Sequence, residues 1–146
     1  MRGTVRSKTN EARIEPLRKA FGDHFDQLEL VEADLLDEES LIKAIAGSDY
    51  VVHTASPVVT ENVKDENILI KPAVNGTLAV MKGCRAAKVK RVVITSSVSA
   101  IYCVDDDKWP DDDIFTEADW SDLESKTGRQ AYNKSKTLAE KAAWDF

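Results

Sequence analysis

The hydrophobic and polar residues follow two alternating patterns along the chain. Short runs rich in β-branched residues are typical of strands and cover residues 3–5, 28–33, 49–54 and 91–95. Apolar residues at helical spacing occupy residues 14–21, 37–46 and 67–87, and a last helix is expected from about residue 130. Strands that alternate with crossover helices predict a parallel α/β sheet covered on both faces, with residues 49–54 as a buried strand.

Small or polar residues follow three of the predicted strands. These residues are Asp34-Leu35, Thr54-Ala55-Ser56 and Ser96-Ser97. Ligands of open parallel sheets bind outside the carboxyl ends of the strands. The pattern therefore predicts that one edge of the sheet binds a ligand.

The composition restricts the classes of function. The 146 residues are 42% hydrophobic and 32% charged, which is typical of one soluble domain with a core. The net charge of -6 argues against a nucleic-acid partner, and no apolar run is long enough to cross a membrane. Cys84 and Cys103 have no further metal-ligating residues at a suitable spacing. We therefore expect reduced thiols, no metal and a cytoplasmic protein.

Tyr132 and Lys136 form the first candidate catalytic pair. They lie four residues apart, on one face of the predicted last helix. A lysine ammonium one turn away favours the phenolate and moves the tyrosine pKa toward the working range of an acid-base catalyst. The pair alone is a weak signal, since exposed Tyr and Lys often share a helix face. A serine at the end of a strand, at residues 96–97, makes a catalytic arrangement the better interpretation.

Taken together, these segments resemble a known family. Arg91-Val92-Val93-Ile94-Thr95-Ser96-Ser97 and Tyr132-Asn133-Lys134-Ser135-Lys136-Thr137-Leu138-Ala139-Glu140 are similar to the extended short-chain dehydrogenase/reductase (NAD-dependent epimerase/dehydratase) superfamily, and most similar to its dihydroflavonol-reductase and cinnamoyl-CoA-reductase branch. Residues 3–6, 34–35, 53–57 and 71–77 match too. The resemblance covers essentially the whole chain. It implies a Rossmann-type doubly wound parallel sheet.

The resemblance assigns roles to individual residues. Tyr132 would donate a proton to the substrate carbonyl, Lys136 would lower the tyrosine pKa and bind the nicotinamide ribose, and Ser97 would hydrogen-bond the carbonyl oxygen. Ser96 would have a structural role. The cofactor-binding set would also include Asp34 and Leu35 beside the adenine, and Thr54, Ala55 and Ser56 along the path to the nicotinamide.

Basic residues near the start of the chain bear on the type of cofactor. The resemblance places Arg6 at the end of the second strand of the family's fold, where an NAD-binding protein usually has an acidic residue. Lys8 and Arg13 follow it, and cations at this place suit the extra phosphate of NADP. The alternative interpretation is a solvated basic turn without a cofactor role. For Arg13, both interpretations stay open. NADP is therefore expected ahead of NAD.

The chain contains no G-x-x-G-x-x-G turn to receive a pyrophosphate. In the family that turn follows the first, central strand, directly upstream of the segment that resembles residues 3–6. We therefore expect residues 1–146 to form a single partial NAD(P)-binding Rossmann domain that lacks the first strand-turn-helix unit. The two sheet halves should then either pair directly or recruit another chain through their edges.

The leading functional hypothesis is an NADPH-dependent reductase of aldehyde or ketone carbonyls, inactive as this fragment and of open oligomeric state. An epimerase or dehydratase of nucleotide sugars with bound NAD is one alternative, and a non-catalytic nucleotide-sensing module is another. His53 is expected to be buried and hydrogen-bonded, and Trp120 and Trp144 to serve packing. The acidic segment at residues 105–113 is expected to be a solvated loop.

Overall fold

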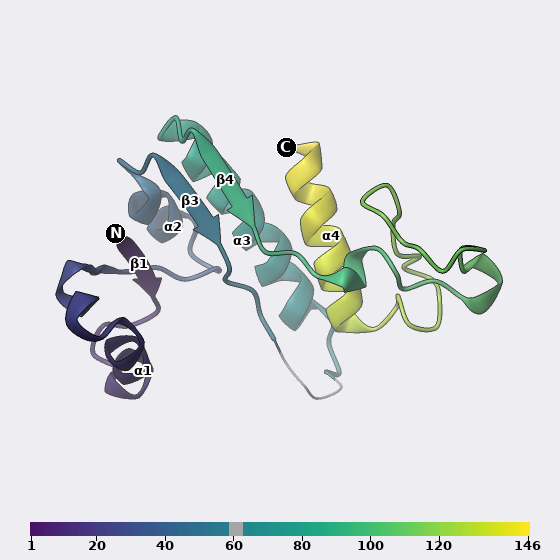
Figure 1. Cartoon of the computed structure of the whole chain (residues 1–146), viewed down its shortest axis with the longest axis horizontal. Helices are drawn as coiled ribbons and strands as arrows, with labels where there is room; N and C mark the ends of the chain where they lie inside the picture. The colour runs from purple at the N-terminus through teal and green to yellow at the C-terminus, as the bar shows by residue number, and fades with distance from the viewer. Residues whose placement is uncertain (59–62) are drawn as a thin grey trace.

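The computed structural model describes residues 1–58 and 63–146. Four parallel strands form two separate two-stranded sheets (Figure 1). β1 (Arg2–Val5) pairs with β2 (Glu29–Glu32), with Arg2 opposite Glu29. β3 (Tyr50–His53) pairs with β4 (Arg91–Ile94), with Tyr50 opposite Arg91. The predicted strands are thus all present, and each ends within two residues of its expected boundary.

The helices also agree with the sequence pattern. They are α1 (Glu11–Phe21), α2 (Glu38–Ile45), α3 (Asn67–Ala86) and α4 (Ala131–Asp145). Short 3-10 helices cover Gly22–Gln27 (η1), Val98–Ala100 (η2) and Asp106–Lys108 (η3). The Asp37 carboxylate caps α2 by accepting a hydrogen bond from the Ser40 N–H at 3.1 Å. No helix in the described ranges is long and apolar enough to cross a bilayer.

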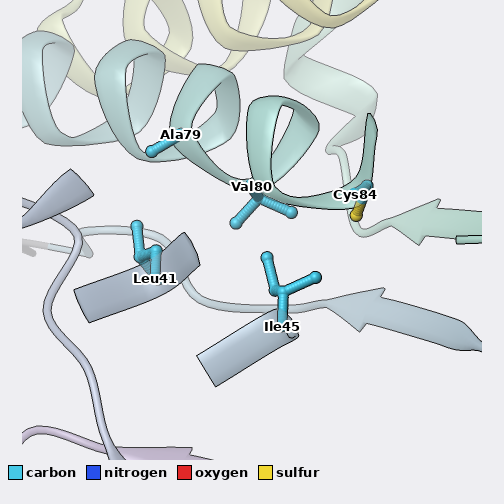
Figure 2. Close-up of a cluster of buried hydrophobic side chains, with 5 residues drawn as sticks. All are labelled: Leu41, Ile45, Ala79, Val80 and Cys84. Atoms are coloured by element: carbon cyan, nitrogen blue, oxygen red, sulfur yellow. The ribbon is translucent and has the colours of Figure 1, made fainter. Parts of the chain in front are cut away.

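The hydrophobic core lies where α3 packs on α2. Leu41, Ile45, Ala79, Val80 and Cys84 are buried against one another (Figure 2). Val51 of β3 and Val92 of β4 pack on this cluster from the sheet. On its other side α3 packs against α4, so one long helix joins the core to the helix that carries Tyr132 (Figure 1).

One face of the β3–β4 sheet is open, which corrects the prediction of a buried strand and a sheet covered on both faces. Tyr50 and Val52 are 67% and 69% exposed, and Val93 is 52% exposed. These residues alternate with Val51 and Val92, which pack on the helices. Successive side chains of a strand point to opposite faces, and the core covers only one of them.

The two sheets stay apart. β1 pairs with β2 alone, and β3 pairs with β4 alone, throughout the part of the chain that the structure describes. Direct pairing of β1 with β3, one of the two expected outcomes, is therefore not what the chain adopts in this structure. The alternative, recruitment of another chain through the free strand edges, stays a prediction, as does a single domain over residues 1–146.

Candidate active site

Tyr132 and Lys136 lie in the first half of α4, on the same face. The Lys136 Nζ is 6.0 Å from the centroid of the Tyr132 ring. Lys136 is only 8% exposed, whereas Tyr132 is half-buried. Among the described residues, the Lys136 ammonium has neither a hydrogen bond nor an ion pair. An ammonium that lacks a partner among the described residues is available to a bound acceptor or anion.

Ser97 follows β4 and caps the short helix η2. Its Oγ accepts a hydrogen bond from the Ser99 N–H at 3.2 Å. Helix α4 packs on η2, so the structure brings the Ser97 turn against the helix that carries Tyr132 and Lys136. Because the Ser99 amide occupies a lone pair of Ser97 Oγ, the hydroxyl proton remains available to a further acceptor.

A cavity of about 280 Å³ lies between the carboxyl ends of β3 and β4 and the helices α3 and α4. Of the predicted cofactor residues, Ala55, Ser56 and Lys136 border it. Its wall also contains His53, Thr77, Met81, Val92, Ile94, Thr95, Ser96, Ala139, Glu140, Ala143 and Trp144. Thr54 is exposed outside this wall, and neither Ser97 nor Tyr132 is part of it.

His53 is buried, as the sequence indicated, and it borders the same cavity. Burial lowers the pKa of its imidazole, and the positive charge of Lys136 lowers this pKa further. The expected hydrogen bond to its ring is not present within residues 1–58 and 63–146. Sequence reasoning placed His53 in a strand and could not place it beside Lys136.

Ser96 and Glu140 were not expected to meet. The Ser96 hydroxyl donates a hydrogen bond to the Glu140 carboxylate, which links the end of β4 to α4. Glu140 lies one turn beyond Lys136, so a helical spacing of four was the signal that could have identified it. Trp144 lies a further turn along. It is 76% exposed, and its indole N–H donates to Glu140 at 3.3 Å, so the prediction that it serves packing is wrong.

Asp34 and Leu35 lie in the turn between β2 and α2. The Asp34 carboxylate accepts the Leu36 N–H at 2.8 Å, and the Asp34 N–H donates to Ser40 Oγ at 3.0 Å. The Leu35 side chain packs so closely on α3 that a Cβ on Gly76 would lie 2.7 Å from it. Asp34 is thus held by local hydrogen bonds, and neither residue borders the cavity.

Arg6, Lys8 and Arg13 are exposed in and after the turn that follows β1. The Lys8 N–H donates to the Glu32 carboxylate at 2.8 Å and ties this turn to the end of β2. None of the three cationic groups has an ion pair with another described residue. The structure does not bring them to the cavity beside Lys136.

Comparison with protein families gives the class of protein. Residues 6–145 match the 3-beta hydroxysteroid dehydrogenase/isomerase family, and the chain belongs to this family. The resemblance to the extended short-chain dehydrogenases and to their dihydroflavonol-reductase branch is thereby confirmed.

Individual relatives are plant reductases. The chain is 40% identical over 153 residues to anthocyanidin reductase ((2S)-flavan-3-ol-forming) of Vitis vinifera, covering 98% of the chain and 43% of the relative. It is 43% identical to tetraketide alpha-pyrone reductase 1 of Arabidopsis thaliana, covering 99% and 44%, and 42% identical to dihydroflavonol 4-reductase of the same plant, covering 100% and 38%. The chain thus spans about two fifths of the length of these relatives.

Solved structures show the same fold. The yeast methylglyoxal/isovaleraldehyde reductase complexed with NADPH superposes with a TM-score of 0.76 at 31% identity, covering 99% of this chain and 44% of that one. Vestitone reductase from alfalfa gives 0.67 at 33% identity, with 99% and 43% covered. The chain is therefore a partial Rossmann-type α/β fold, as the sequence predicted.

Proposed function

We propose that the protein containing this chain is an oxidoreductase that uses NADPH to reduce an aldehyde or ketone carbonyl. The observation that carries this proposal is the position of Lys136, a buried residue whose ammonium has no partner among the described residues. It lies one helical turn from Tyr132, on a helix that packs against the Ser97 turn. The family membership and the reductase names of the relatives support it.

Each of the three residues has a distinct part in the proposed reaction. The Tyr132 hydroxyl donates a proton to the carbonyl oxygen, and the neighbouring Lys136 ammonium stabilises the phenolate that remains. The Ser97 hydroxyl donates a hydrogen bond to the same oxygen, where negative charge develops. The Ser99 N–H supports this role because it takes the acceptor side of the Ser97 hydroxyl.

The residues at the nicotinamide end fit the cofactor. The Lys136 ammonium is a donor without a described partner, which suits the ribose hydroxyls, and Lys136, Ala55 and Ser56 border the same cavity. When bound, NADPH supplies the hydride. Thr54, Asp34 and Leu35 keep the roles that the resemblance gave them, toward the nicotinamide and the adenine.

The chain contains candidate residues for only one of the two phosphate sites of NADPH. Arg6, Lys8 and Arg13 are exposed cations that we assign to the 2′-phosphate. The 146 residues contain no glycine-rich turn for the pyrophosphate. We therefore expect the isolated chain to bind NADPH weakly and to lack activity. Isothermal titration tests this, and micromolar binding by a monomer of the chain would contradict it.

The catalytic proposal is tested in the longest open reading frame that contains these residues, with NADPH and a panel of aldehydes and ketones. Tyr132→Phe should lower kcat by at least about 10²-fold, because a positioned proton donor contributes that much. Tyr50→Phe is the matched control, since Tyr50 is 67% exposed on the open sheet face. Full turnover by Tyr132→Phe would refute the acid role. Purified protein that retains stoichiometric, non-exchanging NAD would favour an epimerase or dehydratase instead.

A further inference from the structure

The backbone of Ser99 is held by hydrogen bonds at both its N–H and its carbonyl, which belong to the two peptide groups on either side of its Cα. Its N–H donates to Ser97 Oγ at 3.2 Å. Its carbonyl accepts two hydroxyls, from Ser121 Oγ at 2.8 Å and from Thr137 Oγ1 at 3.3 Å. The Ser97 hydroxyl is therefore linked, through one residue, to the loop before α4 and to α4 itself.

These groups lie in the interior of the molecule. Ser99 and Ser121 are 7% and 3% exposed, and Thr137 is fully buried. A buried polar group that loses its partner has no water to replace it, so the arrangement resists reorientation. The two buried hydroxyls of Ser121 and Thr137, together with the Ser99 backbone, thus form a rigid polar network rather than a solvated loop.

Ser121 has the stronger hold on the Ser99 carbonyl. Its Oγ also accepts the Cys103 N–H at 2.8 Å, which leaves its single proton for Ser99. Thr137 instead shares its proton with the Asn133 carbonyl of its own helix, at the shorter distance of 2.9 Å. Of the two contacts, that of Ser121 therefore fixes the Ser99 carbonyl more firmly.

We propose that Ser121 is a positioning residue for Ser97 that acts through the Ser99 backbone in the 3-10 helix η2, with Thr137 as a second, weaker contact. This inference rests on the proposed catalytic role of Ser97. Ser121 fixes the Ser99 carbonyl, the Ser99 N–H fixes Ser97 Oγ, and the Ser97 proton is directed at the substrate carbonyl. Thr137, next in sequence to Lys136, ties the same Ser99 carbonyl to the helix of the proposed catalytic Tyr and Lys.

The test is a double-mutant cycle in the longest open reading frame that contains this chain. Ser121→Ala should lower kcat about tenfold and leave the KM for the carbonyl substrate within about twofold, because small misplacements of a reacting group act on the chemical step. In a Ser97→Ala background the same substitution should have no further effect on kcat.

Ser125→Ala is the matched control for a structural effect. Ser125 is a buried hydroxyl of the same loop, 1% exposed, but it bonds the Cys103 and Asp122 carbonyls and not Ser99. It should lower the thermal midpoint as Ser121→Ala does, with a much smaller change in the kcat of the folded enzyme. If Ser121→Ala does not fold, Thr137→Val decides by the same cycle, with Thr137→Ser as its hydroxyl-retaining control.

Two results would overturn the inference. One is an unchanged kcat for the folded Ser121→Ala enzyme, or for Thr137→Val where the first variant does not fold. The other is an equal loss of kcat in the wild-type and Ser97→Ala backgrounds, which would show that the contact acts independently of Ser97. If Ser97→Ala itself keeps full kcat, the proposed role of Ser97 fails first, and the two failures are thereby distinguished.

Discussion

The N-terminal part of the molecule (residues 2–32) and the C-terminal part (residues 38–145) differ in how they use their apolar residues. Each contains one parallel strand pair. In residues 2–32, all of which the structure describes, Ile14 is the single buried hydrophobic residue. The C-terminal part buries the cluster around Val80 and also the polar network around Ser99.

The difference shows that a strand pair does not make a core by itself. Helix α1 packs mainly on the 3-10 helix that follows it. By contrast, α3 packs on both α2 and α4, and the cluster between α2 and α3 packs on the β3–β4 sheet (Figure 1). The two parts are joined by Arg2, whose guanidinium donates to the Ala44 and Ala46 carbonyls, each at 2.9 Å. Under the proposed function, the buried part carries the chemistry and the exposed part selects the cofactor.

A matched pair of glycine substitutions should show the largest contrast in stability. A Cβ on Gly128 would overlap the Asp122 carbonyl and lie 2.7 Å from Ser125 Oγ, so Gly128→Ala should cost at least about 1–3 kcal/mol. A Cβ on Gly3 in β1 would meet only the mobile tips of Leu28 and Leu30, at 3.3 Å and 3.5 Å. Gly3→Ala should change the free energy of unfolding by less than about 1 kcal/mol. Urea titration of both variants measures this, and equal losses would contradict the comparison.

A substitution in the exposed N-terminal part should change the preference for NADPH without changing stability. Arg6→Ala in the longest open reading frame should raise the KM for NADPH about tenfold, because a charge-assisted contact to the 2′-phosphate is worth about 1.5–3 kcal/mol. The KM for NADH and the thermal midpoint should change little, since Arg6 is exposed and has no described ion-pair partner. Steady-state kinetics with both cofactors tests this. Equal losses for NADPH and NADH would show that Arg6 is structural.

Buried His53 should make the stability of the C-terminal part depend on pH. Burial and Lys136 lower the pKa of His53 below the unfolded value of 6.5, so the folded state prefers the neutral ring. Its contribution to stability is complete above pH 6.5 and is lost as the pH falls below that value, where the unfolded chain binds the extra proton. His53→Gln should reduce this loss, because the ring that the folded state keeps neutral is then absent. Urea unfolding between pH 5 and pH 8 provides the measurement, and identical pH profiles for wild type and His53→Gln would refute the assignment.

The smallest effect concerns thiol reactivity. Cys84 and Cys103 are both buried in the C-terminal part, and burial raises the pKa of the Cys84 thiol. Less thiolate and restricted access should make iodoacetamide labelling of the native chain slow. A cysteine introduced at exposed Thr9 should react at the rate of a free thiol. Mass spectrometry over time resolves the three sites, and rapid labelling of Cys84 or Cys103 would show that the C-terminal part opens readily.

The strands and helices were predictable because the sequence patterns that indicate them involve residues close together in the chain. The alternation of strand-like and helix-like runs placed every strand and α-helix, and the carboxylate of Asp37 marked the start of α2. The spacing of Tyr132 and Lys136 fixed their shared helix face without any knowledge of the fold. The split of the sheet into two strand pairs also agreed with the absence of a glycine-rich first unit from the sequence.

Other features depended on which surfaces pack together. Sequence alone placed Val52 in a buried strand, but the helices cover only the opposite face of β3. The cavity wall shared by His53 and Lys136, and the contact between Ser96 and Glu140, join residues far apart in the chain.

By itself, the sequence determined the order and type of the elements and the pairing of Tyr132 with Lys136 on α4. Only the tertiary structure decided how that helix is held against the Ser97 turn. The contact between Thr137 and Ser99 spans 38 residues, and that between Ser121 and Ser99 spans 22. The reason is physical: periodicity records which side of an element is apolar, whereas a buried hydrogen bond depends on where two separate elements meet.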